Sequence, residues 1–270
     1  MTDAESLYLE LMRRSLTRYG FDTLLPVQRK QRSLARRTLL RILEKRNYAL
    51  AHIVPFDEYK REFGLDWPAD AQTMIGMRRL TNLQWCVETV LAENVPGDLV
   101  ECGVWRGGAS ILMRAVLAAY GDTTRRVWLA DSFCGLPAPD VTNYPDDEGI
   151  RLDLCSMLAV SEAEVKLNFK RYGLLDERVN FLPGWFKDTL PTAPIDSIAV
   201  LRLDGDLYES TIQALDALYP RLSVGGFCII DDYHVVDSCK KAVTSYREKQ
   251  EITADIIEID GSGVYWRVTG

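Results

Sequence analysis

The sequence predicts an α/β protein with a doubly wound, mostly parallel, seven-stranded sheet and an N-terminal helical extension. Apolar runs typical of strands alternate with helical segments beyond residue 98. A glycine-rich turn joins the first of these runs to the helix that follows. Several runs end on a carboxylate, the first at Glu101 and the second at Asp131. Since ligands of such sheets bind beyond the carboxyl ends of the strands, we expect the site at that edge.

The order of the elements follows from periodicity and from Gly and Pro signals. A helix over 73–91 carries apolar side chains at helical spacing: Met77, Leu80, Leu83, Val87 and Val90, with Gln84 among them. Strands are expected at 99–103, 126–131, 180–184, 198–204, 226–231, 256–259 and 264–268. Further helices are expected at 109–120, 161–172, 210–219 and 237–250. Residues 51–71 and the Pro- and Asp-rich segment 133–160 are expected to be irregular.

The first 72 residues are expected to form a helical extension or lid, and residues 73–270 the ligand-binding domain. Leu7, Leu11 and Leu16 predict an amphipathic helix over 3–20. The segment 27–50 carries eight basic residues and one acid. A basic amphipathic helix is typical of an acidic partner or a membrane surface. We favour a solvated face on a helix that packs through Leu34, Leu39, Leu40 and Leu43.

Composition excludes several classes of protein. A net charge of −7 argues against general nucleic-acid binding. No apolar run approaches the ~20 residues needed to cross a bilayer, so no membrane span is expected. The first residues lack the basic and apolar regions of a signal peptide, which favours a cytoplasmic protein. The six cysteines form no C-x-x-C pair and there are two histidines, so neither a disulfide framework nor a histidine-rich metal site is expected.

The turn after the first strand predicts a cofactor. Glu101 ends the strand, and Gly103, Gly107 and Gly108 lead into the helix. Glycines let a ligand approach the backbone, and the helix N-terminus favours an anionic group, while Glu101 suits a cationic one. An amino-acid head group carries both signs, which favours S-adenosylmethionine over the pyrophosphate of a dinucleotide; the spacing also departs from G-x-G-x-x-G. The alternative is a purely structural tight turn.

Acids at the ends of later strands predict a metal site. Asp204 closes the run Val-Leu-Arg-Leu, and Asp231 and Asp232 close Phe-Cys-Ile-Ile. Convergent carboxylates are costly unless a cation neutralises them, and oxygen ligands suit Mg²⁺. A single such acid is more often a helix or turn cap. For the three together we favour Mg²⁺.

Two further residues follow strands at this edge. Asp131 occupies the position at which an acid accepts hydrogen bonds from a ribose diol. Trp185 follows Gly184 at the end of the third strand, where its indole could pack on an adenine. The alternatives are a loop cap for Asp131 and an ordinary core position for Trp185.

Longer motifs resemble the macrocin O-methyltransferase family of S-adenosylmethionine-dependent enzymes, which methylate sugar hydroxyls of natural products. The resemblance runs from about residue 73 to 267, and the basic segment 27–50 lies outside it. The motifs are Thr73-Met-Ile-Gly-Met, Glu101-Cys-Gly-Val-Trp-Arg-Gly-Gly, Asp131-Ser-Phe, Phe181-Leu-Pro-Gly-Trp-Phe-Lys-Asp-Thr-Leu-Pro, Leu203-Asp-Gly-Asp-Leu-Tyr, Ile230-Asp-Asp-Tyr and Gly263-Val-Tyr-Trp-Arg.

The resemblance implies a Rossmann-like methyltransferase domain over 73–270 that uses S-adenosylmethionine and Mg²⁺. It implies that Asp204, Asp231 and Asp232 hold the metal and that Asp204 is also the general base. His234 and Asp206 are the competing bases, because histidine titrates near working pH and Asp206 lies two residues from Asp204. The residues expected to bind the cofactor are Thr73, Met74, Met77, Glu101, Gly103, Ser110, Asp131, Ser132, Gly184 and Trp185.

The expected reaction is methyl transfer to a hydroxyl, and the expected acceptor is a deoxysugar of a secondary metabolite. Segment 133–160 and the N-terminal helices are where acceptor specificity is expected. Two alternatives remain at this point: a carboxylate-metal hydrolase on the same fold, and a non-catalytic adenosyl-binding module that docks a partner through the basic segment. The sequence leaves the oligomeric state open, a homo-oligomer included.

Overall fold

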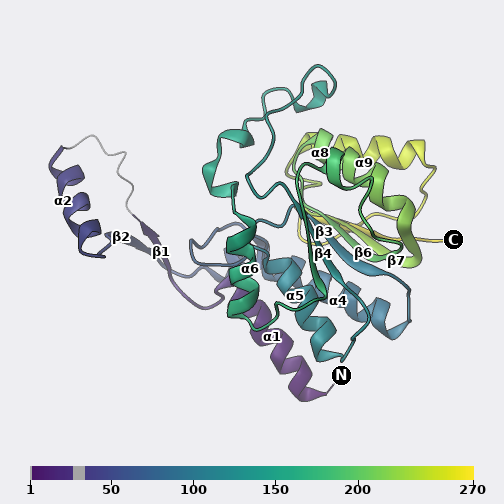
Figure 1. The fold of residues 1–270 in the computed structure, drawn as a ribbon, viewed down its shortest axis with the longest axis horizontal. Helices are drawn as coiled ribbons and strands as arrows, with labels where there is room; N and C mark the ends of the chain where they lie inside the picture. Colours follow the sequence, from purple (N-terminus) through teal and green to yellow (C-terminus); the bar gives the residue numbers. More distant parts are fainter. Residues whose placement is uncertain (1, 27–33) are drawn as a thin grey trace.

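A seven-stranded sheet forms the centre of the protein, whose structure is a computed structural model describing residues 2–26 and 34–270. The strand order is β5-β4-β3-β6-β7-β9-β8. The first five of these strands are parallel, and β9 and β8 extend the sheet beyond β7 through antiparallel pairs. The predicted doubly wound architecture is confirmed (Figure 1). The strands are β3 Asp98–Cys102, β4 Val127–Asp131, β5 Val179–Pro183, β6 Ile198–Leu203, β7 Leu222–Ile230, β8 Ile257–Glu258 and β9 Val264–Arg267.

Helices cover both faces of the sheet because side chains alternate along each strand. On β4, Val127 and Leu129 join one apolar core while Trp128 and Ala130 join the other. The first core includes side chains of α1 (Asp3–Thr17), α4 (Met77–Ala92), α5 (Gly108–Ala119) and α6 (Glu162–Arg171). The second includes side chains of α8 (Tyr208–Leu218) and α9 (Asp237–Lys249), with the short α7 (Phe186–Thr189) beside α8.

The order of the strands locates the binding edge. The chain moves outward from β3 to β4 and β5, then returns to pair β6 on the other side of β3. The crevice therefore opens between the carboxyl ends of β3 and β6, where ligands of doubly wound sheets bind. Gly103 follows β3 and Asp204 follows β6 at this point.

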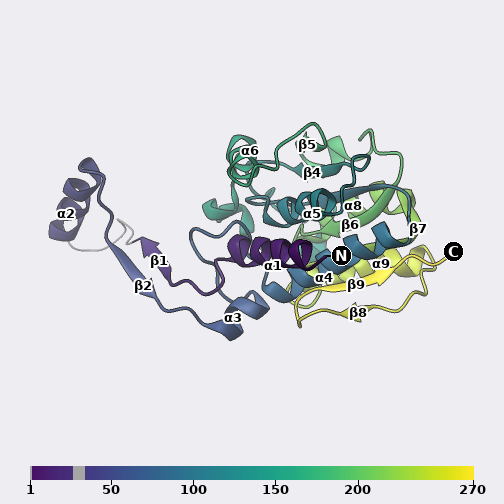
Figure 2. The same ribbon diagram turned by 90° about the horizontal axis from the view of Figure 1, so that it is seen from below.

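The N-terminal region combines helices with a two-stranded ribbon. β1 (Thr23–Pro26) pairs antiparallel with β2 (Ala51–Val54), and α2 (Leu34–Lys45) follows β1 along the chain. Figures 1 and 2 show the ribbon and α2 projecting away from the sheet. α3 (Glu58–Phe63) then leads back to α4. Among the described residues, no helix combines the length and the apolar character needed to cross a membrane.

Two predictions for this region are wrong. Leu7 and Leu11 are exposed, and α1 instead buries the stripe Leu9, Met12 and Leu16 against the first core. Both stripes have helical spacing, so the neighbouring helices decide which one is buried. Residues 51–71 contain β2 and α3 rather than irregular chain.

The predicted basic helix ends before residue 50. α2 spans Leu34–Lys45, and residues 27–33 lie outside the described residues. Leu40 is buried, but Leu39 is exposed and so does not pack as predicted. Arg37 and Arg41 are exposed, as a solvated basic face requires.

Segment 133–160, named the roof below, connects β4 to α6. It contains three single turns of 3₁₀ helix, η1 (Pro145–Asp147), η2 (Leu152–Leu154) and η3 (Ser156–Leu158). In Figure 1 it lies at the top of the molecule, between α6 and α8. It thus stands outside the sheet, next to the helix that follows the Asp204–Asp206 loop.

Candidate active site

The glycine turn brings β3 and β6 into backbone contact. Gly103 has a φ of 81°, and a Cβ on it would lie 1.8 Å from the carbonyl oxygen of Asp204. Only glycine fits both the conformation and the space. A Cβ on Gly108 would lie 2.5 Å from the carbonyl oxygen of Gln72, which accepts a hydrogen bond from the Gly108 N–H. These close approaches set the Thr73 segment against the start of α5.

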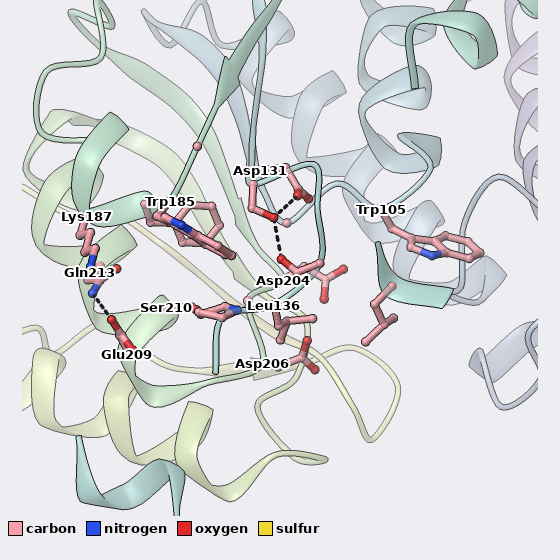
Figure 3. A pocket seen from close by; sticks show the side chains of 18 of the residues that line it. Trp105, Asp131, Leu136, Trp185, Lys187, Asp204, Asp206, Glu209, Ser210 and Gln213 are labelled. Atoms are coloured by element: carbon pink, nitrogen blue, oxygen red, sulfur yellow. Dashed lines mark hydrogen bonds between the residues drawn. The ribbon is translucent and has the colours of Figure 1, made fainter. Parts of the chain in front are cut away.

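A pocket opens at the carboxyl ends of β3, β4, β5 and β6 (Figure 3). In this view Trp185 and Trp105 lie on opposite sides, with Asp131 and Asp204 between them. The roof contributes apolar atoms from Leu136, Pro137 and Leu158. α8 and the turn before it contribute polar side chains: Asp206, Glu209, Ser210 and Gln213. The pocket is therefore apolar beneath the roof and polar at the strand ends.

Six of the ten residues predicted to bind the cofactor line this pocket: Met74, Gly103, Asp131, Ser132, Gly184 and Trp185. The Asp131 carboxylate accepts hydrogen bonds from the N–H groups of Val104 (2.7 Å) and Phe133 (2.8 Å), and burial raises its pKa. These bonds fix the carboxylate at the pocket wall, and an ionised carboxylate retains lone pairs for a ligand.

The other four predicted cofactor residues lie behind the pocket wall. Glu101 is 2% exposed, and both of its carboxylate oxygens are engaged, one by Ser110 and one by Arg202. Ser110 itself is fully buried. Thr73 accepts a hydrogen bond from the Ile75 N–H, and Met77 lies in the first turn of α4. None of these four residues lines the pocket.

The three aspartates predicted to hold a metal converge. Each of Asp204, Asp231 and Asp232 offers one carboxylate oxygen, and these oxygens all lie within 4.8 Å of one another. Asp231 and Asp232 are buried, while Asp204 is half-buried and lines the pocket. The group, with Asp206 beside it, is named the acidic rim below.

Two buried arginines support the acidic rim. Arg202 donates to Glu101 Oε1 (2.6 Å), to Asp204 Oδ2 (3.1 Å) and to Asp231. Arg79 donates to the other oxygen of Asp231 and to Asp260 (2.9 Å). Two guanidinium groups are thus shared among four carboxylates, so the cluster carries more negative than positive groups.

The surplus negative charge appears in the pKa values. Burial, reinforced by Asp231, raises the pKa of Asp204 to about 6. Burial, reinforced by Asp204 and Asp231, raises the pKa of Asp206 to about 7. The pKa of Asp232 rises well above its usual range, first through burial and then through the neighbouring carboxylates. A cation at this place would relieve the repulsion.

His234, the competing base, occupies a different position. The residue is exposed, and its ring meets the Tyr233 ring edge-on with 5.0 Å between the centroids, while its backbone N–H donates to the carbonyl oxygen of Ser262. His234 is not among the described residues that line the pocket, whereas Asp204 and Asp206 are. The two aspartates therefore face the pocket, whereas the His234 ring lies outside its lining.

Sequence reasoning missed the two arginines and the polar side chains of α8. Arg202 had a signal, because a charged residue within the apolar run Val-Leu-Arg-Leu must find a buried partner. Arg79 had none, since arginine is ordinary in a helix such as α4. Glu209 and Gln213 line the pocket because of where α8 begins, which the sequence does not indicate.

Comparison with known proteins identifies the family. The model of the family "Macrocin-O-methyltransferase (TylF)" matches residues 5–268. The chain belongs to this family. It is an S-adenosylmethionine-dependent O-methyltransferase, which removes the hydrolase and the binding module from the alternatives.

Relatives of known activity and structure agree with this assignment. The chain is 53% identical over 268 residues to the 8-demethyl-8-(2,3-dimethoxy-α-L-rhamnosyl)-tetracenomycin-C 4′-O-methyltransferase of Streptomyces olivaceus, covering 99% of this chain and 94% of the relative. It is 58% identical over 215 residues to the demethyldecarbamoylnovobiocin O-methyltransferase of Streptomyces niveus, covering 79% and 82%. The structure of the O-methyltransferase NovP superimposes with a TM-score of 0.86 at 49% identity, covering 98% of this chain and 100% of that one.

Proposed function

We propose that this O-methyltransferase transfers the methyl group of S-adenosylmethionine to a hydroxyl of a deoxysugar on a secondary metabolite, with Mg²⁺ held by the acidic rim. The observation that carries the proposal is the convergence of Asp204, Asp231 and Asp232 beside the pocket that begins at the Gly103 turn. The two relatives described above act on glycosylated natural products, and this chain spans most of the length of each.

The donor set of the acidic rim fits a divalent cation with oxygen ligands. The three carboxylates lie close enough to share one ion, and Asp232 has no arginine among the hydrogen-bond partners described for it. Asp231 bonds to both arginines, but each carboxylate oxygen has a further lone pair. When bound, Mg²⁺ supplies positive charge against the negative charge that develops on the acceptor hydroxyl.

Asp204 is the proposed general base. Of the three converging aspartates it is the one that lines the pocket, so its carboxylate is within reach of an acceptor. Arg202 holds one of its oxygens, Oδ2, which leaves Oδ1 to accept the proton of the hydroxyl. General base catalysis of this kind contributes about 10²–10⁴-fold to a rate. Asp206 is the second candidate by position, ahead of His234.

The donor is proposed to lie along the pocket wall from Gly103 to Trp185. Asp131 is proposed to accept hydrogen bonds from the ribose diol and the Trp185 indole to pack on the adenine, which is supported by both side chains lining the pocket. The backbone turn at Gly103 leaves room for the amino-acid end. Such an arrangement aims the methyl group toward Asp204 and leaves the space under Leu136 and Leu158 for the sugar.

An assay of the purified protein tests the proposal. S-adenosylmethionine is supplied with the tetracenomycin glycoside and with demethyldecarbamoylnovobiocin, and methylated product is measured by mass spectrometry. We expect turnover of a glycosylated acceptor, loss of turnover in excess EDTA and recovery with Mg²⁺. Full activity in excess chelator contradicts the metal role, and turnover of the aglycones alone contradicts the sugar acceptor.

A further inference from the structure

The roof is attached to the acidic side of the pocket through a buried carboxylate. Asp147 is 0% exposed, although it belongs to an acidic stretch, Asp146-Asp147-Glu148, of an irregular segment. Its Oδ1 accepts a hydrogen bond from the Tyr208 N–H (2.6 Å), and its Oδ2 accepts one from the Glu209 N–H (3.0 Å). One side chain of the roof thus satisfies two N–H groups of α8.

These two bonds replace a local helix cap. The N-cap residue of α8, Leu207, has no side chain that can accept a hydrogen bond. The first N–H groups of a helix need acceptors, and a negative charge there is stabilised by the helix dipole. Asp147 supplies both the acceptor and the charge from 61 positions away along the chain. The start of α8 and the roof therefore depend on one another.

The capped end of α8 belongs to the pocket. Glu209 and Ser210 line it, and Tyr208 follows Asp206 of the acidic rim by two positions. On the roof side, Leu136, Pro137 and Leu158 line the same pocket. A second bond, from Trp105 Nε1–H to the Met157 carbonyl oxygen (2.9 Å), holds the far end of the roof.

We propose that Asp147 is a positioning residue that fixes the roof over the acceptor side of the pocket by capping α8. This inference rests on the proposed transfer to a sugar hydroxyl, because it assigns the space under the roof to the acceptor. Asp147 touches neither donor nor acceptor. Its removal frees the roof while the donor wall from Gly103 to Trp185 stays in place.

The test compares Asp147→Ala and Asp147→Asn with a matched control, Asp146→Ala. Asp146 is the preceding residue of the same turn, and its carboxylate makes an exposed ion pair with Lys241 (2.6 Å, side chains 38% and 59% exposed). Amide hydrogen exchange of the full-length protein reports on residues 136–158. Steady-state kinetics with the tetracenomycin glycoside give KM and kcat, and calorimetry gives the Kd of S-adenosylhomocysteine.

In Asp147→Ala we expect exchange of the roof amides and the acceptor KM both to rise about tenfold, since two hydrogen bonds to a charged group are lost. The Kd of S-adenosylhomocysteine should stay within about twofold of the wild type. Asp147→Asn should give exchange rates and a KM between those of the wild type and Asp147→Ala, because an amide offers one oxygen acceptor instead of two. Asp146→Ala should match the wild type.

Two results overturn the proposal. One is roof exchange in Asp147→Ala and Asp147→Asn no faster than in Asp146→Ala. The other is a loss of S-adenosylhomocysteine affinity that parallels the rise in KM, as a general structural role would give. If the wild type methylates no glycoside, the proposed function fails, while the exchange measurement still decides whether Asp147 holds the roof.

Discussion

The acidic rim and the roof face the same pocket but are held in place by different means. Each aspartate of the rim follows a buried strand, and two buried arginines bridge its members to Glu101 and Asp260. The roof has no strand, and turns and irregular chain separate its single turns of 3₁₀ helix. Its contacts with neighbouring elements include the hydrogen bonds of Asp147 and Trp105, the ring contact between Tyr144 and Tyr208, and the exposed ion pair between Asp146 and Lys241.

This difference indicates that the acidic rim and the roof have different functions. Residues at the ends of central strands are fixed by the whole sheet, which suits groups that must hold the reacting atoms within narrow limits. A segment held by a few polar bonds can change without disturbing the core, which suits recognition of different acceptors. Changes in the rim should therefore act on turnover and stability, and changes in the roof on acceptor affinity.

The largest effect is expected at the proposed base. Asp204→Asn keeps the size and the bond to Arg202 but removes the proton acceptor, so kcat should fall about 10²–10⁴-fold. Calorimetry should show the affinity for S-adenosylhomocysteine nearly unchanged. Activity close to that of the wild type would remove Asp204 from the mechanism and direct attention to Asp206 and then His234.

The next effect concerns stability and compares one arginine of each region. Arg202→Met leaves Glu101 without its buried cationic partner and Asp231 with only Arg79 of its two, and it should lower the free energy of unfolding by about 3–5 kcal/mol. The control is Arg151→Met in the roof, where the ion pair with Asp153 is exposed and the unfolding midpoint should not move. Urea unfolding in the presence of EDTA measures both. Equal midpoints for the two variants would show that the buried network does not hold the rim.

A smaller effect is expected for donor binding along the pocket wall from Gly103 to Trp185. Trp185→Ala removes the indole from the pocket wall, and the Kd of S-adenosylhomocysteine should rise about tenfold through lost stacking. Trp67→Ala, which removes an exposed indole that does not line the pocket, serves as the control. If both variants bind S-adenosylhomocysteine like the wild type, the adenine does not pack on Trp185.

The smallest effect is expected for single apolar contacts of the roof. Leu158→Ala should raise the acceptor KM about threefold with little change in kcat, because it removes a few methyl groups from the space above the sugar. Leu154→Ala, at a 69% exposed position of the same segment, should leave KM unchanged. A fall in kcat at constant KM for Leu158→Ala would mean that the roof, like the rim, acts on the chemical step.

The sequence determined the sheet and the position of the site. Strands and helices from residue 98 onward could be predicted from apolar periodicity and from the glycines between them. These predictions hold because the local preference of each segment agrees with its place in the sheet. The carboxylates after the strands could be foreseen at one edge, since the carboxyl ends of parallel strands always meet there.

Tertiary structure alone decided the remaining features. It chose the Leu9–Leu16 stripe of α1 over Leu7 and Leu11, paired β1 with β2, and turned Glu101 inward to Ser110 and Arg202. It also brought Asp147 to the start of α8. Each of these depends on contacts between residues far apart in the chain, whose partners cannot be read from the spacing of residues within one segment.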